Sequence, residues 1–257
     1  MLPLTDQVEI VRYKNGLMQT EMDTVINEHR LSLELNGEHY TRLICSPANL
    51  KELAVGHLFA EGIIKSMSEI AAVEQTDDDL IKIELHKKHS VKTPERTITT
   101  GLGGPPSLSY HMLDGQICLP VGEKFDIKKI AMLASEFQSQ SRIFQETGGV
   151  HACALYPING ESFFMEDIGR HNAFDKVVGA ALIKNAELSG SVLFTTGRIP
   201  SDMVIKAVHV GLPLVVSRSA PTKSAVEMAR DFNITLCGFA REGRMNIYSV
   251  PERLVTL

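Results

Sequence analysis

The stretch that decides the fold is SVLFTTGRIPSDMVIKAVHVGLPLVVSRSAPTKSAVEMARDFNITLCGF, residues 191–239. Short apolar runs alternate in it with segments of helical spacing. Gly211 follows the first helical segment and Pro221 opens the second, as is common at helix ends. The predicted order is a strand at 191–195, a helix at 201–210, a strand at 214–217, a helix at 221–232 and a strand at 234–239. This alternation predicts an α/β fold with a mainly parallel sheet and helices on both faces.

The same pattern continues on both sides of this stretch. One face of a preceding helix is predicted from the apolar residues Phe174, Val177, Val178, Ala181 and Leu182. Further predicted strands are Val150–Tyr156 and Ser162–Asp167, joined by a turn at Asn159-Gly160, and Met245–Val250. Upstream of these strands, Asp126 is predicted to cap a single helix whose apolar face carries Ile130, Leu133, Ala134, Phe137 and Phe144. The predicted α/β domain therefore spans residues 121–257.

Residues 1–120 have a different pattern, which predicts a smaller, β-rich α+β domain. Its predicted strands are Val8–Tyr13, Arg30–Leu35, Tyr40–Cys45 and Leu80–Leu85, with one helix between Pro47 and Gly62. The run TITTGLGGPP, residues 97–106, is too rich in glycine and proline for a regular element. We therefore expect a loop over 97–120, either as a linker between two domains or as part of a functional site.

Composition excludes several classes of protein. The chain has 26 Lys and Arg against 31 Asp and Glu, a net charge of −5, which does not suit a nucleic-acid-binding surface. Apolar residues make up 44% of the chain, too many for a disordered protein, and no run is long enough to span a membrane. The N-terminus is charged too early for a signal peptide. The four cysteines form no CxxC pair, so we expect free thiols in the reducing cytosol.

Arginines follow the predicted strands where those strands end. They are Arg170, Arg198, Arg218 and Arg241, with Arg244 shortly after the last. The carboxyl ends of parallel strands meet at one edge of a sheet, where ligands gather and helix N-termini carry partial positive charge. Arginine can hold a phosphate through two parallel hydrogen bonds. The sequence therefore favours a basic, phosphate-binding edge over the alternative, in which these arginines are ordinary solvated helix caps.

Small and polar residues at the same turns complete the candidate binding set: Gly169, His171, Asn172, Thr196, Gly197, Ser217 and Ser219. Small side chains let the backbone approach a ligand closely. His171 suits an acid–base role, a ligand contact or a structural hydrogen bond, and Asn172 is a predicted N-cap. His151 is interpreted as a buried residue beside Cys153 with no catalytic role. No metal-binding or nucleophile motif is present, and Cys118 is the thiol that we expect to be most exposed.

Long segments of the chain resemble one family. They are IGRHNAFDKVVGAAL (168–182), TTGRIPSDMVIKAVHVGLPLVVSRSAPTKSAVEMA (195–229) and GFAREGRMNIY (238–248), extended by residues 46–64 and 147–156. On these segments the chain resembles the FdhD family, the accessory sulfurtransferases of formate dehydrogenases. The resemblance implies a cytoplasmic homodimer whose C-terminal domain is a cytidine-deaminase-like, three-layer domain with a mixed sheet.

The resemblance also implies a cargo and partners. Members of the family carry sulfur from a cysteine desulfurase to the molybdenum bis(molybdopterin guanine dinucleotide) cofactor, which is then inserted into the catalytic subunit of formate dehydrogenase. The family's cofactor-binding run corresponds to Phe239, Ala240, Arg241, Glu242, Gly243 and Arg244. GDP-like ligands suit the predicted basic edge, and neither a nucleic acid nor a membrane is an expected partner.

The family's likeness to deaminases does not extend to a zinc site. Zinc deaminases need H-x-E at one helix start and PCxxC at the next, because histidine and cysteine bind the metal and glutamate moves the proton. The corresponding helix starts read His171-Asn172-Ala173 and Arg198-Ile199-Pro200-Ser201 in this chain. We therefore expect no zinc and no deamination.

The loop of this chain also departs from the family, whose members carry a persulfide-forming cysteine there. Leu102 stands at the first expected cysteine position and Pro105 at the second. A thiolate is the group that accepts and passes sulfur, so Leu102 cannot form a persulfide. Two functions stay open: a sulfur carrier that uses another cysteine, with Cys118 as the fallback, and a cofactor or guanine-nucleotide chaperone without sulfur transfer. A nucleotide-modifying enzyme is a third alternative, which the missing metal ligands weaken.

Overall fold

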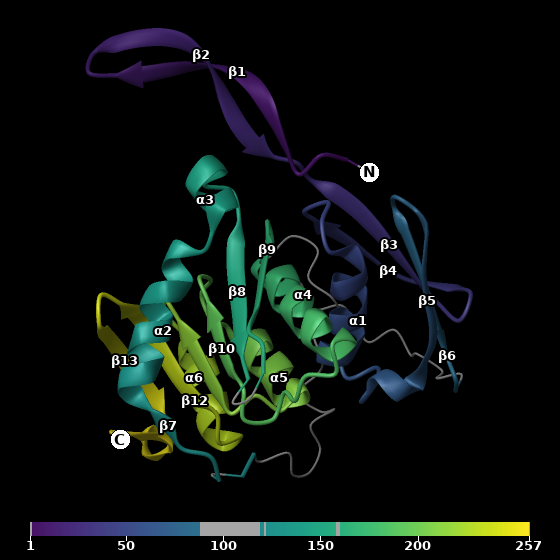
Figure 1. Ribbon diagram of the computed structural model, residues 1–257, viewed down its shortest axis with the longest axis vertical. Coiled ribbons are helices and arrows are strands. Elements are labelled where there is room, and N and C mark those ends of the chain that lie inside the picture. The colour runs from purple at the N-terminus through teal and green to yellow at the C-terminus, as the bar shows by residue number, and fades with distance from the viewer. Residues whose placement is uncertain (1, 88–118, 121, 158–159, 257) are drawn as a thin grey trace.

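The computed structural model describes residues 2–87, 119–120, 122–157 and 160–256 (Figure 1). Six strands of the second half form one sheet, in the order β13-β12-β11-β10-β8-β9. They are β8 (His151–Tyr156), β9 (Phe163–Asp167), β10 (Val192–Thr195), β11 (Leu214–Ser217), β12 (Thr235–Arg241) and β13 (Arg244–Ser249). Every element that we predicted over residues 191–239 is present, with its ends shifted by at most two residues.

The sheet is mixed, so the expectation of a mainly parallel sheet was wrong. β10 pairs with β11, and β11 with β12, in parallel, whereas β8 is antiparallel to both of its neighbours and β13 is antiparallel to β12. Antiparallel partners need no crossover helix, so short connections lead from β8 to β9 and from β12 to β13. Asn159 of the predicted turn lies outside the described residues. The deaminase-like layout that the resemblance implies stays a prediction.

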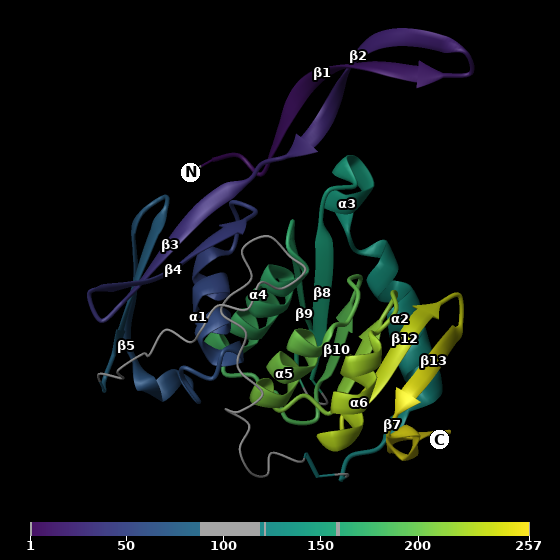
Figure 2. The ribbon, with the colours of Figure 1, turned by 180° about the vertical axis from the view of Figure 1, so that it is seen from behind.

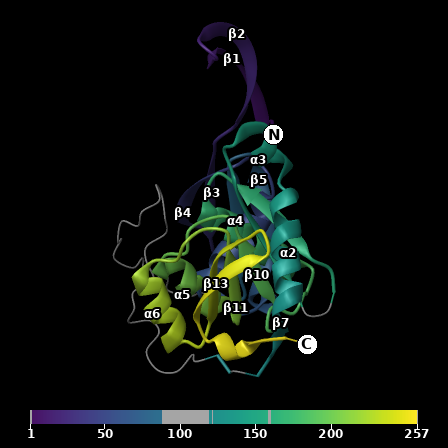
Figure 3. The ribbon, with the colours of Figure 1, turned by 90° about the vertical axis from the view of Figure 1, so that its left-hand side faces the viewer.

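Helices cover both faces of this sheet (Figure 3). On one face lie α4 (Arg170–Ile183), α5 (Ser201–Val210) and α6 (Lys223–Asp231), and on the other lies α2 (Ile127–Ser139). Successive side chains of a strand point to opposite faces, so Leu193 packs in the core under α4 and α5, and Phe194 packs in the core under α2. The described part of this domain therefore has three layers.

The segment before β8 forms two helices, not the single helix that we predicted. Asp126 caps α2 as expected, by accepting a hydrogen bond from the Lys128 N–H at 3.0 Å. A second helix, α3 (Arg142–Thr147), starts after Ser141, whose hydroxyl accepts from the Phe144 N–H at 3.3 Å. Serine side chains at 139 and 141 compete with the helical backbone bonds, which explains the break. Phe144 therefore leaves the apolar face of α2 and is 46% exposed.

The first half of the chain forms a four-stranded sheet, in the order β4-β3-β6-β5, and a separate hairpin. The sheet contains β3 (His29–Leu35), β4 (Glu38–Cys45), β5 (Ile70–Asp77) and β6 (Leu80–Leu85), and α1 (Leu50–Ala60) packs on it. β1 (Thr5–Lys14) and β2 (Leu17–Ile26) form the hairpin, which extends away from the body (Figures 1 and 2). The strands β2 and β5 were not predicted from the sequence, because most of their side chains are not fully buried and their apolar residues do not clearly alternate.

The smaller elements are η1 (Met67–Glu69), β7 (Phe125–Asp126), η3 (Pro251–Arg253) and β14 (Leu254–Val255).

The two halves meet where α1 packs against α4 (Figure 1). Gly56 of α1 faces Gly179 of α4, and the two backbones approach so closely that neither position has room for a Cβ atom. Buried ion pairs surround this crossing: Lys206 binds Asp175 at 2.7 Å and Glu61 at 3.0 Å, and His57 Nδ1 lies 3.0 Å from Asp175. The N-terminal half therefore supports the helix that begins at Arg170.

Among the described residues, no helix is both long enough and apolar enough to cross a membrane. Leu102, Cys118 and most of the predicted loop at 97–120 lie outside the described residues. The domain boundary near residue 120 therefore stays a prediction.

Candidate functional site

Four strands of the large sheet, β9, β10, β11 and β12, run in the same direction. β9 belongs to this group because it is antiparallel to β8, which is itself antiparallel to β10. Their carboxyl ends therefore lie at one edge, and Arg170, Arg198, Arg218 and Arg241 stand at or just after these ends. We name this the arginine edge. The structure thus brings together the four arginines that the sequence analysis selected.

Side-chain hydroxyl groups hold the turns of the arginine edge together. Ser217 Oγ donates to the Gly197 carbonyl at 2.7 Å and accepts from the Ser219 N–H at 2.9 Å. Ser219 Oγ donates to the Thr196 carbonyl at 3.0 Å, and Thr196 Oγ1 accepts from the Ala152 N–H at 3.0 Å. Ser217 is fully buried and builds the turn, whereas Thr196 and Ser219 also line the cavity described next.

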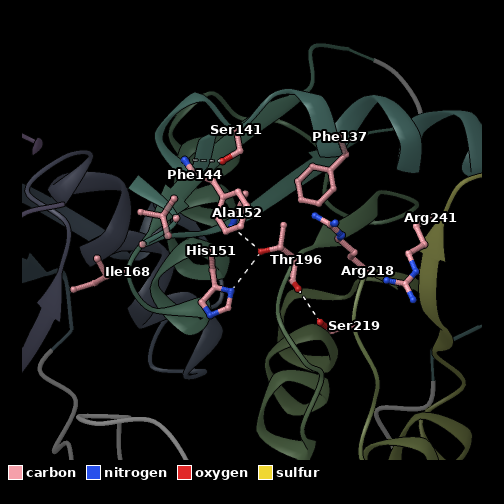
Figure 4. A pocket seen from close by; sticks show the side chains of 13 residues that line it. Phe137, Ser141, Phe144, His151, Ala152, Ile168, Thr196, Arg218, Ser219 and Arg241 are labelled. Carbon is pink, nitrogen blue, oxygen red and sulfur yellow. Dashed lines mark hydrogen bonds between the residues drawn. The ribbon is translucent and has the colours of Figure 1, made fainter. Parts of the chain in front are cut away.

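A cavity of about 470 Å³ lies between the arginine edge and helices α2 and α3. Sites for small molecules usually have volumes in this range. Figure 4 shows Arg218 and Arg241 on one side of the cavity and Phe144 and Ile168 on the other, with His151 between them. The cavity therefore combines two cationic side chains with an apolar wall.

His151 is half-buried in the wall of this cavity, rather than a core residue beside Cys153. Its Nδ1 lies 3.4 Å from Thr196 Oγ1 (Figure 4). Burial lowers the pKa of His151, and the charges of Arg170, His171 and Arg198 lower it further. The imidazole is therefore neutral at pH 7, so it can donate one hydrogen bond and accept another.

His171 pairs with an acidic residue that the sequence analysis did not select. Its Nε2 lies 3.0 Å from Asp202 Oδ2 at the start of α5. Burial acts to raise the pKa of Asp202, but the hydrogen bond and charge of His171, the Met203 N–H and the charge of Arg170 together lower it. Asp202 is thus ionised at neutral pH and holds the His171 ring in place, an arrangement that suits proton transfer as well as ligand binding.

Asn172 and Gly169 shape the turn before α4. The helix begins at Arg170 with Gly169 as its N-cap, so the prediction of Asn172 as the cap was wrong. Asn172 Nδ2 donates to the Ile44 carbonyl at 2.7 Å and to Asp167 Oδ1 at 2.9 Å, and the Gly169 N–H donates to the same oxygen at 2.8 Å. These contacts give Asn172 a structural role within the turn.

Positive charge is crowded at this end of the arginine edge. Burial lowers the pKa of Arg170; Asp202 opposes this effect, and the charge of Arg198 adds to it. Gly197 has no room for a side chain, because a Cβ atom there would lie 2.9 Å from Arg170 Cβ. An anionic ligand would relieve this crowding, since it supplies the opposite charge.

The predicted run from 239 to 244 forms the end of the β12–β13 hairpin. Arg241 pairs with Arg244 across the strands, and Glu242 and Gly243, both with positive φ, form the two-residue turn. Phe239 is 37% exposed and has a φ of 52°. Ala240 is buried in the core under α2, so its side chain does not face a ligand. Of this run, only Arg241 lines the cavity.

The described cysteines are not suited to carry sulfur. Cys45, Cys153 and Cys237 are buried, and burial is the main cause that raises the pKa of each thiol to about 12. Such thiols stay protonated at neutral pH, and a persulfide carrier needs a thiolate. Cys118 and Leu102 lie outside the described residues.

Several cavity residues escaped the sequence analysis: Ser141, Gly148, Gly149, Val150 and Ile168. Phe137 and Phe144 were assigned only to a helix core. The segment TGGVHACALY was noted for its family resemblance, and its paired glycines next to a histidine were the available signal. The sequence around α2 and α3 does not show that these helices form one wall of the cavity, because their packing across the sheet creates that wall.

In the described part of the chain, no three His, Cys, Asp or Glu side chains are placed to hold a metal ion.

Comparison with known proteins gives consistent matches along almost the whole chain. The FdhD/NarQ family model matches residues 26–255. Proteins named "Sulfur carrier protein FdhD" from Staphylococcus aureus strains MRSA252 and JH9 are each 37% identical over 254 residues, covering 96% of this chain and 95% of theirs. A solved structure of a formate dehydrogenase accessory protein from Desulfotalea psychrophila is similar with a TM-score of 0.78 and 27% identity, covering 98% of this chain and all of that one.

Proposed function

Since this chain belongs to the FdhD/NarQ family, we propose that it is an accessory protein of formate dehydrogenase that binds the molybdenum bis(molybdopterin guanine dinucleotide) cofactor as its cargo. The single observation that carries this proposal is the arginine edge beside a cavity of about 470 Å³. Each guanine dinucleotide arm presents a pyrophosphate, and arginine binds phosphate through charge-assisted, bidentate hydrogen bonds. The residues present therefore fit an anionic nucleotide cargo.

Calorimetry with GDP tests this proposal, because GDP reproduces the guanine nucleotide part of the cargo. We expect the double variant Arg198→Ala, Arg241→Ala to lose affinity by roughly a hundredfold, since a hydrogen bond to a charged group contributes about 1.5–3 kcal/mol. The matched control is Arg30→Ala, Arg42→Ala, which removes two exposed arginines from the N-terminal sheet. Absence of GDP binding to the wild-type protein at millimolar concentration would overturn the proposal.

Leu102 at the expected cysteine position, together with the three buried thiols, favours a second candidate. In that candidate the protein is a chaperone that binds the cofactor and delivers it without carrying sulfur. Incubation with a cysteine desulfurase and cysteine, followed by persulfide labelling, separates the two. A label that is lost in Cys118→Ala supports a sulfur carrier with Cys118 in that role; an unlabelled protein supports the chaperone.

The remaining expectations about partners also belong to this proposal. A cysteine desulfurase, the catalytic subunit of formate dehydrogenase and a second copy of this chain are the proposed partners, and the free thiols among the described cysteines favour the cytoplasm. Complementation of a strain that lacks its own family member, with the wild-type chain and with Leu102→Cys, shows whether the chain matures formate dehydrogenase and whether this cysteine is what it lacks.

A further inference from the structure

The N-terminal hairpin exposes large apolar side chains to solvent. Its strands β1 and β2 pair over ten residues each and extend away from the body (Figures 1 and 2). The exposed fraction is 64% for Val11, 69% for Tyr13, 64% for Leu17, 76% for Met18 and 57% for Met22. A two-stranded ribbon is only marginally stable by itself in water, and exposed apolar patches usually mark interaction surfaces. The hairpin is therefore built to be covered.

Four of these five side chains share one side of the ribbon. Directly opposite residues of an antiparallel pair lie on the same side, and the side alternates along each strand. The register therefore places five cross-strand pairs together: Thr5 with Ile26, Gln7 with Thr24, Glu9 with Met22, Val11 with Thr20 and Tyr13 with Met18. We name this the apolar side of the hairpin. Glu9 is its single charged residue.

The opposite side of the hairpin carries the remaining charges: Asp6, Arg12, Lys14, Glu21 and Asp23. The Arg12 guanidinium pairs with the carboxylate of Glu21 and, at 3.2 Å, with that of Asp23. Charged groups lose solvation when they are buried, whereas ion pairs of this kind are stable in water. The charged side thus suits solvent, and the apolar side suits a partner.

We propose that a second copy of this chain docks on the apolar side, so that the two hairpins pack against each other about a two-fold axis. The inference deepens the proposed function and rests on it for the second copy as a partner, to which it assigns a surface. A two-fold interface needs a patch that complements itself, and an apolar side with one charge matches an identical side. A ribbon with two free edges also pairs readily with other chains, so it needs a lasting cover, and a second copy is present wherever the chain is made.

The base of the hairpin determines how the two copies are arranged. There the apolar side faces the body: α3 packs against β2, and a Cβ atom at Gly149 would lie 2.8 Å from the Ile26 side chain. The body is much wider than the ribbon (Figure 1), so parallel hairpins would bring the two bodies together, whereas antiparallel hairpins keep them at opposite ends. Each tip, with Tyr13 and Met18, then reaches α3 of the partner.

This arrangement also covers Phe144 on α3, whose side chain is 46% exposed. A strand of ten residues at about 3.4 Å per residue gives a ribbon about 34 Å long. Two such sides, with a contact between tip and α3 at each end, supply on the order of the 1,200 Å² that a specific interface buries. Because Phe144 also lines the cavity, the partner's tip completes one rim of the candidate site.

Sedimentation velocity of the full chain over a range of concentrations is the first test. We expect a dimer whose dissociation constant rises at least about a hundredfold in Val11→Asp, Met18→Asp, because both carboxylates would be buried without a partner. The matched control is Val8→Asp, Leu17→Asp. It makes the same kind of change on the charged side of the same hairpin and should stay dimeric.

Photocrosslinking locates the tip without relying on these variants. Tyr13→p-benzoylphenylalanine is introduced into the full chain, and unlabelled protein is mixed with protein labelled with ¹⁵N. We expect crosslinks between labelled and unlabelled chains that end within α3, Arg142–Thr147. Crosslinks confined to one chain, or ending elsewhere on the partner, would contradict the arrangement.

The outcomes separate this inference from the proposed function. A Val11→Asp, Met18→Asp variant as dimeric as the wild type overturns the surface, and so does a control that becomes equally monomeric. A monomeric wild type whose apolar side instead binds the catalytic subunit of formate dehydrogenase also overturns it. Calorimetry with GDP reports on the proposed function separately, since absence of GDP binding leaves the dimer surface untouched.

Discussion

Asp167 is the buried residue that connects the candidate site to the N-terminal half. Its carboxylate pairs with Lys176 at 2.7 Å and accepts from the N–H and hydroxyl of Ser46 at 3.0 and 3.1 Å. It also accepts from the Gly169 N–H and from Asn172, which shape the turn before Arg170. One carboxylate thus fixes the end of β4, the first turn of α4 and the buried ammonium of Lys176.

We predict that Asp167→Asn destabilises the protein strongly. The variant leaves the ammonium of Lys176, which is fully buried, without its counter-ion, and breaking a buried pair costs about 3–5 kcal/mol. Urea unfolding of the variant and the wild type measures the difference in the free energy of unfolding. The matched control is Glu227→Gln, which breaks the exposed Lys223–Glu227 pair and should change this free energy by less than about 1 kcal/mol. Equal effects of the two substitutions would contradict the prediction.

Helices α1 and α4 cross at two glycines, and this contact joins the two halves of the molecule. A Cβ atom at Gly56 would lie 1.8 Å from the Asp175 carbonyl oxygen, and one at Gly179 would lie 1.9 Å from the Glu52 carbonyl oxygen. Both obstacles are backbone atoms, which cannot rotate away as a flexible side chain could. Glycine is therefore required here for close approach, although it weakens an isolated helix.

Gly56→Ala should consequently push α1 away from α4. Replacing glycine by alanine inside a helix usually stabilises the protein, but here we expect the opposite. We expect a loss of at least about 1–3 kcal/mol in the free energy of unfolding, the scale of overpacking in a core, and a weaker affinity for GDP because α4 carries Arg170. Guanidinium unfolding and calorimetry measure the two effects. Gly122→Ala serves as the control, since a Cβ atom there meets nothing within 4 Å. Unchanged stability in Gly56→Ala would mean that the helices can move apart freely.

The buried thiols make the stability of the whole molecule depend on alkaline pH. Burial raises the pKa of Cys45, Cys153 and Cys237 from an ordinary value of 9.0 to about 12. Between these values the unfolded chain releases protons that the folded chain keeps, so the free energy of unfolding falls as pH rises. The stabilisation is complete below about pH 9 and is lost towards pH 12.

We therefore expect the free energy of unfolding to decrease between pH 9 and 11 by up to about 1.4 kcal/mol per pH unit for each thiol. Denaturant titrations at several pH values measure this slope. The triple variant Cys45→Ala, Cys153→Ala, Cys237→Ala should be less stable at pH 8 but show a shallower decline above pH 9. Parallel slopes for the two proteins would exclude the thiols as the cause.

Much of the fold could be predicted because its signals are local. The elements over 191–239 were predicted closely, since apolar spacing and boundary residues such as Gly211 and Pro221 lie within each element. The break between α2 and α3 was missed, because side-chain hydrogen bonds at Ser139 and Ser141 outweigh a continuous apolar pattern. The direction of β8 was also missed, since the apolar pattern of a strand does not show whether it pairs with its neighbours in parallel or antiparallel.

For the candidate site, the sequence by itself determined which cations stand at strand ends and that no zinc motif is present. Only the tertiary structure decided that Phe144 and His151 share a cavity with Arg218 and Arg241, and that His171 pairs with Asp202. The physical reason is the range of the interactions. Periodicity and capping act within a few residues, whereas a cavity wall or a buried ion pair depends on segments that only the packed sheet brings together.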